Sequence, residues 1–209
     1  MKKKFDKKKF ASNIAISFFF AALFIVVFYF FLEETVASYV SLINTTAVKS
    51  SIEEKIATYD LAQRKLISYP KYGKKYATIE IESIKLNLPV YYGDTNKILK
   101  LGVGHYNGSY FPGENGTIIM AAHNNPGYFH ELDNVKVGDS IVIKASYGTF
   151  KYEVEKTAIV KETNLEAFEV SHDEEKLILY TCYPINRSVL GRKTQRYVVY
   201  AKKVGDNFE

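Results

Sequence analysis

The sequence predicts an all-β domain, a closed barrel or a sandwich, that follows one membrane-spanning helix. Three observations predict it: an uncharged apolar stretch at residues 11–32, six short alternating apolar and polar segments after residue 76, and Gly- and Pro-containing turns between them. Closely spaced strands with little helix are typical of barrels and sandwiches.

The N-terminus predicts a membrane anchor. Residues 1–10 hold six lysines and one aspartate, and we interpret them as a cytoplasmic tail. Residues 11–32 carry no charge, and as a helix they extend about 33 Å, enough to cross a bilayer core of about 30 Å. A cleaved signal peptide is the alternative, with a poor cleavage context at residues 36–38. By the positive-inside rule, everything after residue 32 lies outside the cell.

The anchor also accounts for the net charge. The chain carries +5, and its first ten residues carry the same excess, so the remainder is neutral. A neutral exported part lacks the basic surface that nucleic-acid binding requires. We therefore expect no nucleic-acid partner.

Residues 33–70 are predicted to be a connector between the anchor and the barrel. Ser51 and Glu54 fit a capping box, and apolar residues recur at helical spacing up to Leu66. The pattern predicts a short amphipathic helix over residues 51–67 that ends before Pro70. A spacer packing on the domain is a simpler interpretation than a partner-binding helix.

The barrel domain is predicted to span residues 71–205, followed by a tail at 206–209. Six segments in this region have the alternation of strands, and a domain of this length can enclose one core. They are residues 76–93, 116–123, 140–146, 150–160, 176–182 and 194–204.

Cys182 is the one cysteine of the chain, so it cannot form an internal disulfide or a multi-thiolate metal site. An inert buried thiol, an intermolecular disulfide and a nucleophile remain open. Period-2 alternation puts Ile178, Tyr180 and Cys182 on one face of a strand. Pro184 removes the next backbone donor, so the strand should end just after Cys182. We therefore expect the thiol at the end of a strand, where rigid backbone meets a groove that solvent can reach, whereas an inert core thiol would more naturally lie in the middle of a strand.

Two further side chains complete a candidate catalytic set. His123 also ends an apolar strand, whereas His105, His130 and His172 lie in segments that indicate loop or surface roles. Arg196 lies in a predicted strand, and its guanidinium could stabilise an oxyanion, although a surface salt bridge is the simpler interpretation. We find no metal-ligand pattern and expect no cofactor.

These residues together resemble the sortases, the membrane-anchored cysteine transpeptidases of Gram-positive bacteria. The family motif L-x-T-C is matched by Leu179 to Cys182, and its strand-ending histidine by Ala122-His123. Its R-[YF]-V-V motif is matched by Arg196 to Val199, and I-x-I-x-x-I-x-L-x-L-P-V by residues 79–90. The similarity covers about residues 75–203, with the motifs in the family's order.

The resemblance is strongest to class D, with a compact housekeeping enzyme as the alternative. Asn124 and Asn125 follow the histidine where many relatives have Arg-Asp. No second membrane-length segment follows Arg196, and the segment at 161–176 is too short for the helix inserted in the haem-uptake class.

The resemblance implies a closed eight-stranded β-barrel and a transpeptidation mechanism. Cys182 is expected to attack the Thr–Gly bond of an LPxTG-like sorting signal on a secreted protein and form a thioacyl enzyme. His123 is expected to act as acid and base, Arg196 to stabilise the oxyanion, and Thr181 to help bind substrate. A peptidoglycan precursor or cross-bridge amine would then resolve the acyl enzyme. A cysteine hydrolase and a non-catalytic surface-binding module remain the alternatives.

Overall fold

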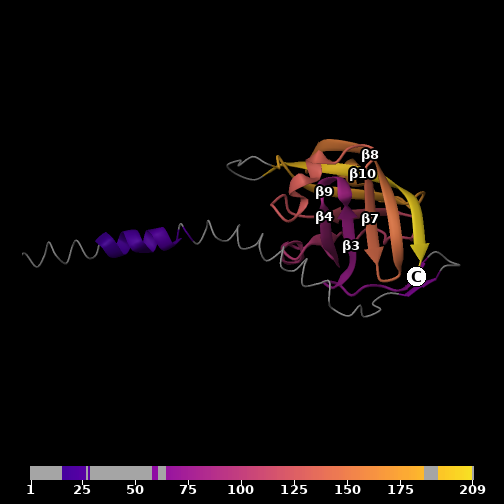
Figure 1. The fold of residues 1–209 in the computed structure, drawn as a ribbon, viewed down its shortest axis with the longest axis horizontal. Coiled ribbons are helices and arrows are strands. Elements are labelled where there is room, and N and C mark those ends of the chain that lie inside the picture. Colours follow the sequence, from indigo (N-terminus) through magenta and orange to yellow (C-terminus); the bar gives the residue numbers. More distant parts are fainter. Residues whose placement is uncertain (1–15, 27, 29–57, 61–64, 186–192, 209) are drawn as a thin grey trace, which may run out of the picture. The chain divides into compact units, whose positions relative to one another are not determined.

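Eight strands close into a barrel that holds the core of the protein (Figure 1). In this computed structural model the described residues are 16–26, 28, 58–60, 65–185 and 193–208. The barrel strands are β3 (Lys75–Ile81), β4 (Leu86–Tyr92), β5 (Val103–His105), β6 (Thr117–Ala121), β7 (Ser140–Ala145), β8 (Gly148–Lys161), β9 (Lys176–Tyr183) and β10 (Gln195–Phe208).

The order around the barrel is β10-β8-β7-β3-β4-β5-β6-β9, and β9 closes it by pairing with β10. The pairs β4–β5 and β6–β9 are parallel, whereas the other barrel pairs are antiparallel. Short helical segments join the strands. They are η2 (Glu82–Ile84), α2 (Asn96–Leu99), η3 (Phe129–Asn134) and η4 (Leu165–Phe168). The predicted closed eight-stranded β-barrel is therefore confirmed.

Alternation along the strands divides the apolar residues between the inside and the outside of the barrel. The large core contains the inward residues of β8, such as Phe150 and Tyr152, together with Leu177 and Leu179 of β9. A smaller cluster on the opposite face of the sheet contains Ile119, Ile178 and Val198. Successive residues of each strand therefore point alternately into the barrel and out of it.

The predicted strands are found, but two features were missed. The segment 76–93 forms two strands, β3 and β4, because Lys85 takes a left-handed conformation (φ 52°) after η2. The strand β5 was not predicted, because three residues in a glycine-rich segment carry no alternation. Gly104 is required here, since a Cβ at this position would lie 2.7 Å from the carbonyl oxygen of Gly93.

The predicted amphipathic helix over residues 51–67 is wrong where the structure describes it. The strands β1 (Thr58–Asp60) and β2 (Lys65–Ser68) form an antiparallel pair. Leu66 is buried in the barrel core, and the Tyr59 hydroxyl donates to the carbonyl of Gly113 at 2.5 Å. Tertiary contacts override the local helical spacing here. Residues 51–57 and 61–64 lie outside the described residues.

The boundaries of the domain differ slightly from the prediction. The strand β10 continues to Phe208 and pairs with β8 along its length, so residues 206–208 belong to the barrel and not to a tail. Of the predicted anchor at 11–32, residues 16–26 are described as helix. Within the described part of the chain, no helix has the length and apolar character needed to cross a membrane. The tail at 1–10 and most of the connector lie outside the described residues.

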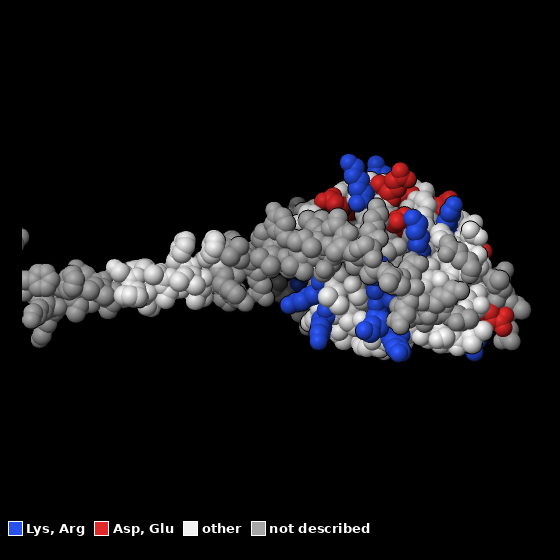
Figure 2. Space-filling view, turned by 60° about the horizontal axis from the view of Figure 1, so that its bottom comes forward, with Lys and Arg blue, Asp and Glu red and all other residues white. Residues whose placement is uncertain are grey.

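Basic and acidic side chains are both exposed on the face of the barrel unit that Figure 2 shows. This mixture agrees with the neutral balance of the chain after residue 10.

A buried carboxylate ties three elements together beside the start of β9. Glu175 accepts hydrogen bonds from the backbone N–H groups of Gly113 and Asn115 and from the hydroxyl of Tyr152. It also pairs with the ammonium of Lys203 at 3.1 Å. Its side chain is only 3% exposed, so the loop before β6 and the strands β8 and β10 supply the donors that this buried charge needs.

We predict that Glu175→Ala lowers the free energy of unfolding by about 3–5 kcal/mol, because it leaves the buried Tyr152 hydroxyl and two backbone N–H groups without their acceptor. Among the described residues, Lys203 then keeps only its pairing with Asp206. Chemical denaturation measures the loss. Glu174→Ala is the matched control: this exposed neighbour pairs with Lys176 at the surface, and its loss should cost less than about 1 kcal/mol. Equal losses for the two variants would contradict the prediction.

Candidate active site

Three strand ends meet at one end of the barrel and bring the predicted site residues together. Because β6 runs parallel to β9, both strands end at this edge, and β10 begins there because it runs antiparallel to β9. Arg196 is the direct partner of Cys182 in the β9–β10 ladder. His123 lies two residues beyond Ala121, whose partner is Tyr180, so its register matches that of Cys182.

Cys182 occupies the outer face of its strand and not the core. It is a partly exposed free thiol, whereas its neighbour Thr181 is 1% exposed. Ile178 and Tyr180 share its face, as the alternation predicted, and both belong to the outer cluster. A buried inert thiol would lie among the inward residues, so this placement favours a reachable thiol.

Thr181 and Asn124 join the end of β6 to the end of β9. The Thr181 hydroxyl donates to the carbonyl of Ala122 at 2.8 Å. The Asn124 amide donates to the carbonyl of Cys182 at 2.9 Å and to that of Pro184 at 3.3 Å. The residues on both sides of His123 are therefore bonded to the strand that carries the thiol.

The position of Thr181 changes its predicted role. A side chain that points into the barrel and is almost fully buried is not placed to touch a substrate on the outer face. The expected direct contact with substrate therefore has no support in this geometry. Its hydroxyl instead fixes the segment that precedes His123.

His123 is half-buried, and its ring meets the ring of Tyr128 edge-on at a centroid distance of 5.8 Å. Burial lowers the pKa of its imidazole below the ordinary value, and the charge of Lys100 lowers it further. The neutral imidazole is therefore favoured near pH 7, which is the form that can accept a proton.

Arg196 is held in place by three hydrogen bonds. Its Nη2 pairs with the Glu162 carboxylate at 2.8 Å, and its Nη1 donates to the carbonyls of Lys193 and Gln195. The salt bridge that was the simpler interpretation of Arg196 is therefore present, with Glu162 as the partner. It does not exclude a second role, because a guanidinium has five N–H donors and the described residues use three.

A groove of about 590 Å³, which we call the Tyr180 groove, runs along the outer face beside these residues. Arg196, Tyr180 and Ile119 line its strand side, and Tyr106 and Phe168 line it from neighbouring segments, with the Phe168 ring edge-on to that of Tyr180 at a centroid distance of 4.9 Å. Burial raises the pKa of Tyr180, so its hydroxyl stays protonated and can donate. The groove could hold an extended peptide beside the thiol.

The other histidines lie away from this end or make other contacts. His105 was expected in a loop, and this is wrong: it lies in β5 and is fully buried. Burial lowers its pKa to about 3, so it is neutral. His130 bonds to the carbonyl of Asn124 through Nδ1, and exposed His172 stacks on Tyr110.

Sequence reasoning missed Asn124 and Glu162 as neighbours of the candidate site. Asn124 was noted only as a departure from the pattern of many relatives, and Glu162 carried no signal. Both act through partners more than 30 positions away, which local patterns cannot reveal. No cluster of three His, Cys, Asp or Glu suited to a metal occurs within the described ranges.

The fold is a closed β-barrel with Cys182, His123 and Arg196 at one end, and comparison with known proteins gives its family. A model of the sortase domain matches residues 79–204. The chain therefore belongs to the sortase family, and this membership supports the role of a transpeptidase.

Individual relatives agree with this assignment. The chain is 37% identical to Sortase D of Bacillus subtilis (strain 168) over 145 residues, which are 69% of this chain and 72% of the relative. A solved Clostridium perfringens Sortase D5 transpeptidase is 30% identical with a TM-score of 0.57, covering 65% of this chain and 82% of its own. Clostridium perfringens sortase C, solved with the C-terminal cell wall sorting motif, is 31% identical with a TM-score of 0.57, covering 65% and 73%.

We predict that Asn124→Ala lowers the transpeptidase turnover number by about ten- to a hundredfold, because the backbone of Cys182 loses its hydrogen bond to the segment that carries His123. Peptide turnover at saturating substrate measures the effect. Asn125→Ala is the matched control in the same turn and should keep turnover within about twofold. Equal turnover in both variants would show that Asn124 does not position the thiol.

Proposed function

We propose that this sortase cleaves an LPxTG-like sorting signal between Thr and Gly and joins the protein to an amine of the cell wall. The observation that carries this proposal is the alignment of Cys182, Arg196 and His123 at one end of the barrel, beside a peptide-sized groove. The complex of the Clostridium perfringens sortase C with a sorting motif supports the substrate class.

In the proposed first step, Cys182 Sγ gives its proton to neutral His123 and attacks the threonine carbonyl carbon. A C–S bond forms, and the carbonyl oxygen becomes an oxyanion. Arg196 stabilises this negative charge with the N–H donors that the described residues do not use. The C–N bond to glycine then breaks, and protonated His123 gives its proton to the departing amine. The product is a thioacyl enzyme.

In the second step an incoming amine attacks the thioester. His123 accepts a proton from the amine, the new amide bond forms, and the C–S bond breaks. The thiolate leaves and recovers its proton from His123, which restores the starting state. The lowered pKa of His123 suits the two steps in which it must accept a proton. In the proposal no metal or cofactor takes part.

Thr181 and Asn124 act indirectly in this scheme. Both hold backbone groups that flank the reacting residues. We assign Thr181 a positioning role, which replaces the direct substrate contact predicted from the sequence.

We further propose that residues 11–32 anchor the chain in the cell membrane with residues 1–10 in the cytoplasm. The catalytic barrel would then lie outside the cell, where secreted substrates and peptidoglycan amines are found. The uncharged length of 11–32 and its basic flank support this orientation.

Intact-mass spectrometry tests the function. We expect the full chain in detergent to gain the mass of the acyl fragment when it is mixed with LPxTG peptides that vary at x, and to release a joined product when triglycine is added. Cys182→Ala should gain no mass. A hydrolase would form the adduct but release only the free acid with triglycine present, whereas a non-catalytic module would form no adduct.

We predict that Arg196→Lys lowers the turnover number by about 10²–10³-fold with the fold unchanged, because an ammonium cannot reproduce the forked donors at an oxyanion. Turnover of the LPxTG peptide and circular dichroism measure the two effects. Gln195→Lys adds the same side chain at the exposed neighbouring position and serves as the control. Turnover near wild type in Arg196→Lys would remove the residue from the mechanism.

A further inference from the structure

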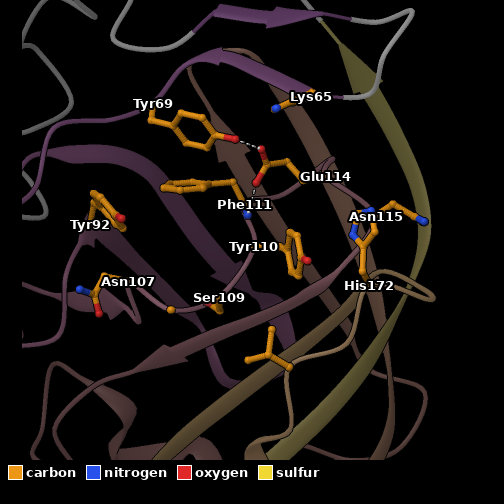
Figure 3. Close-up of a pocket in the computed structure, with 12 residues that line it drawn as sticks. Lys65, Tyr69, Tyr92, Asn107, Ser109, Tyr110, Phe111, Glu114, Asn115 and His172 are labelled. Atoms are coloured by element: carbon orange, nitrogen blue, oxygen red, sulfur yellow. Dashed lines mark hydrogen bonds between the residues drawn. The ribbon is translucent and has the colours of Figure 1, made fainter.

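A second cavity lies beyond the Tyr180 groove, and we call it the Tyr110 cavity. It has a volume of about 800 Å³. Figure 3 shows the rings of Tyr69, Tyr92 and Tyr110 around it, with the amides of Asn107 and Asn115 on opposite sides. Nothing in the mechanism above uses these residues. A cavity with aromatic faces and a few polar groups is typical of a binding site.

Two chain segments, residues 106–109 and residues 168–170, separate the Tyr110 cavity from the Tyr180 groove. Tyr106 lines the Tyr180 groove and the next residue, Asn107, lines the Tyr110 cavity. Phe168 lines the groove in the same way, and Val170 lines the cavity. The cavity is therefore the immediate neighbour of the groove, across the segments at 106–109 and 168–170.

The register of β6 shows on which side of the groove the cavity lies. The backbone N–H of Tyr106 donates to the carbonyl of Ile119, and that of Tyr110 donates to the carbonyl of Thr117. Thr117 begins β6, and its partner Lys176 begins β9. The Tyr110 cavity thus lies toward the beginnings of both strands, whereas Cys182 lies near the end of β9.

Strand geometry gives the number of peptide residues between the thiol and the cavity. Threonine and leucine are three residues apart in an extended Leu-Pro-x-Thr segment, which is about 10 Å at about 3.3 Å per residue. The same three steps separate Cys182 from Leu179 on β9. With threonine at the level of Cys182, the leucine reaches the level of Leu179 and of its partner Met120. About three more residues reach the level of Lys176 and Thr117.

The acyl side of the substrate is the side that must lie along the groove. In the proposed function four motif residues precede the scissile bond and one follows it. The Tyr180 groove extends from Arg196, the partner of Cys182, back along β9 to Ile119, the partner of Ile178, so it suits the longer, acyl part. Substrate residues that precede the motif then continue toward the Tyr110 cavity.

The wall between the two sites is held rigidly. The Ser109 hydroxyl donates to the carbonyl of Tyr106, so its oxygen is free to accept from the backbone N–H of Ile119 and from Nε2 of His105. Nδ1 of His105 then accepts from the Tyr76 hydroxyl at 2.8 Å. A wall fixed in this way loses little conformational entropy when a peptide binds against it.

The aromatic lining favours uncharged residues. The Glu114 carboxylate is 8% exposed and accepts from the Tyr69 hydroxyl and the backbone N–H of Phe111. Lys65 lines the same cavity, so the lining carries a charge of each sign and gives no net electrostatic preference for an acidic or a basic peptide. Tyrosine rings contact apolar and proline side chains, and the two asparagine amides can bond to a peptide backbone.

We infer that the Tyr110 cavity binds about four uncharged residues that precede the sorting motif, and that it makes this sortase prefer substrates extended upstream of the motif. The inference rests on the proposed function, because the direction of the peptide follows from cleavage at Thr–Gly. The site would distinguish substrates by sequence outside the pentapeptide itself.

Two peptides and the full chain in detergent test the inference. One peptide is a minimal Leu-Pro-x-Thr-Gly, and the other carries Ser-Thr-Ala-Pro before it; kcat/KM is measured for both with triglycine as the acceptor. We expect the extended peptide to have a kcat/KM at least tenfold higher, mainly through a lower KM.

Val170→Arg should reduce the extended peptide to the level of the minimal one, because a long charged side chain enters the cavity, and should leave the minimal peptide unchanged. Val204→Arg is the matched control: this valine is also exposed (54%, against 39% for Val170), lies on β10 and lines neither site. It should leave both peptides unchanged.

Equal kcat/KM for the two peptides with the wild-type chain would overturn the inference while the proposed function stands. A preference for the extended peptide that Val170→Arg leaves intact, in a variant that turns over the minimal peptide normally, would also overturn it. Turnover of neither peptide would contradict the proposed function, and the inference would fail with it.

Discussion

The parallel pairing of β6 with β9 is the constraint on which the candidate site depends. Parallel strands end at the same edge, so a histidine after one and a cysteine at the end of the other share that edge even though they are 59 positions apart in the sequence. The antiparallel pairing of β9 with β10 then places Arg196 directly opposite Cys182. The side chains of Thr181 and Asn124 hold this edge where the ladder of β6 has ended.

The two faces of β9 carry different kinds of residues. Leu177, Leu179 and Thr181 face the core, and they make the strand rigid. Ile178, Tyr180 and Cys182 face outward, where the Tyr180 groove lies. A rigid strand that presents a thiol near its end keeps that thiol in a fixed position without burying it.

The beginning of β9 is anchored as firmly as its end. Glu175 binds the loop before β6 and the strands β8 and β10, so both ends of the strand that carries Cys182 are held. The loop that Glu175 holds also contributes Glu114 and Asn115 to the Tyr110 cavity. The stability of the barrel and the shape of this cavity therefore depend on the same buried carboxylate.

The sequence by itself determined the class of fold, most of the strands, the strand-end positions of His123 and Cys182, and the strand that carries Arg196. Alternation and turn residues are local signals, and they can be recognised without knowing which strands pair. The tertiary structure decided what depends on distant partners. It placed residues 58–60 and 65–68 in strands and not in a helix, buried His105, and turned Thr181 inward. It also assigned Asn124 to the carbonyl of Cys182 and formed the Tyr110 cavity from segments more than 50 residues apart. Each of these depends on strand pairing between remote residues, and the free energy of burial and buried hydrogen bonds there outweighs local preference.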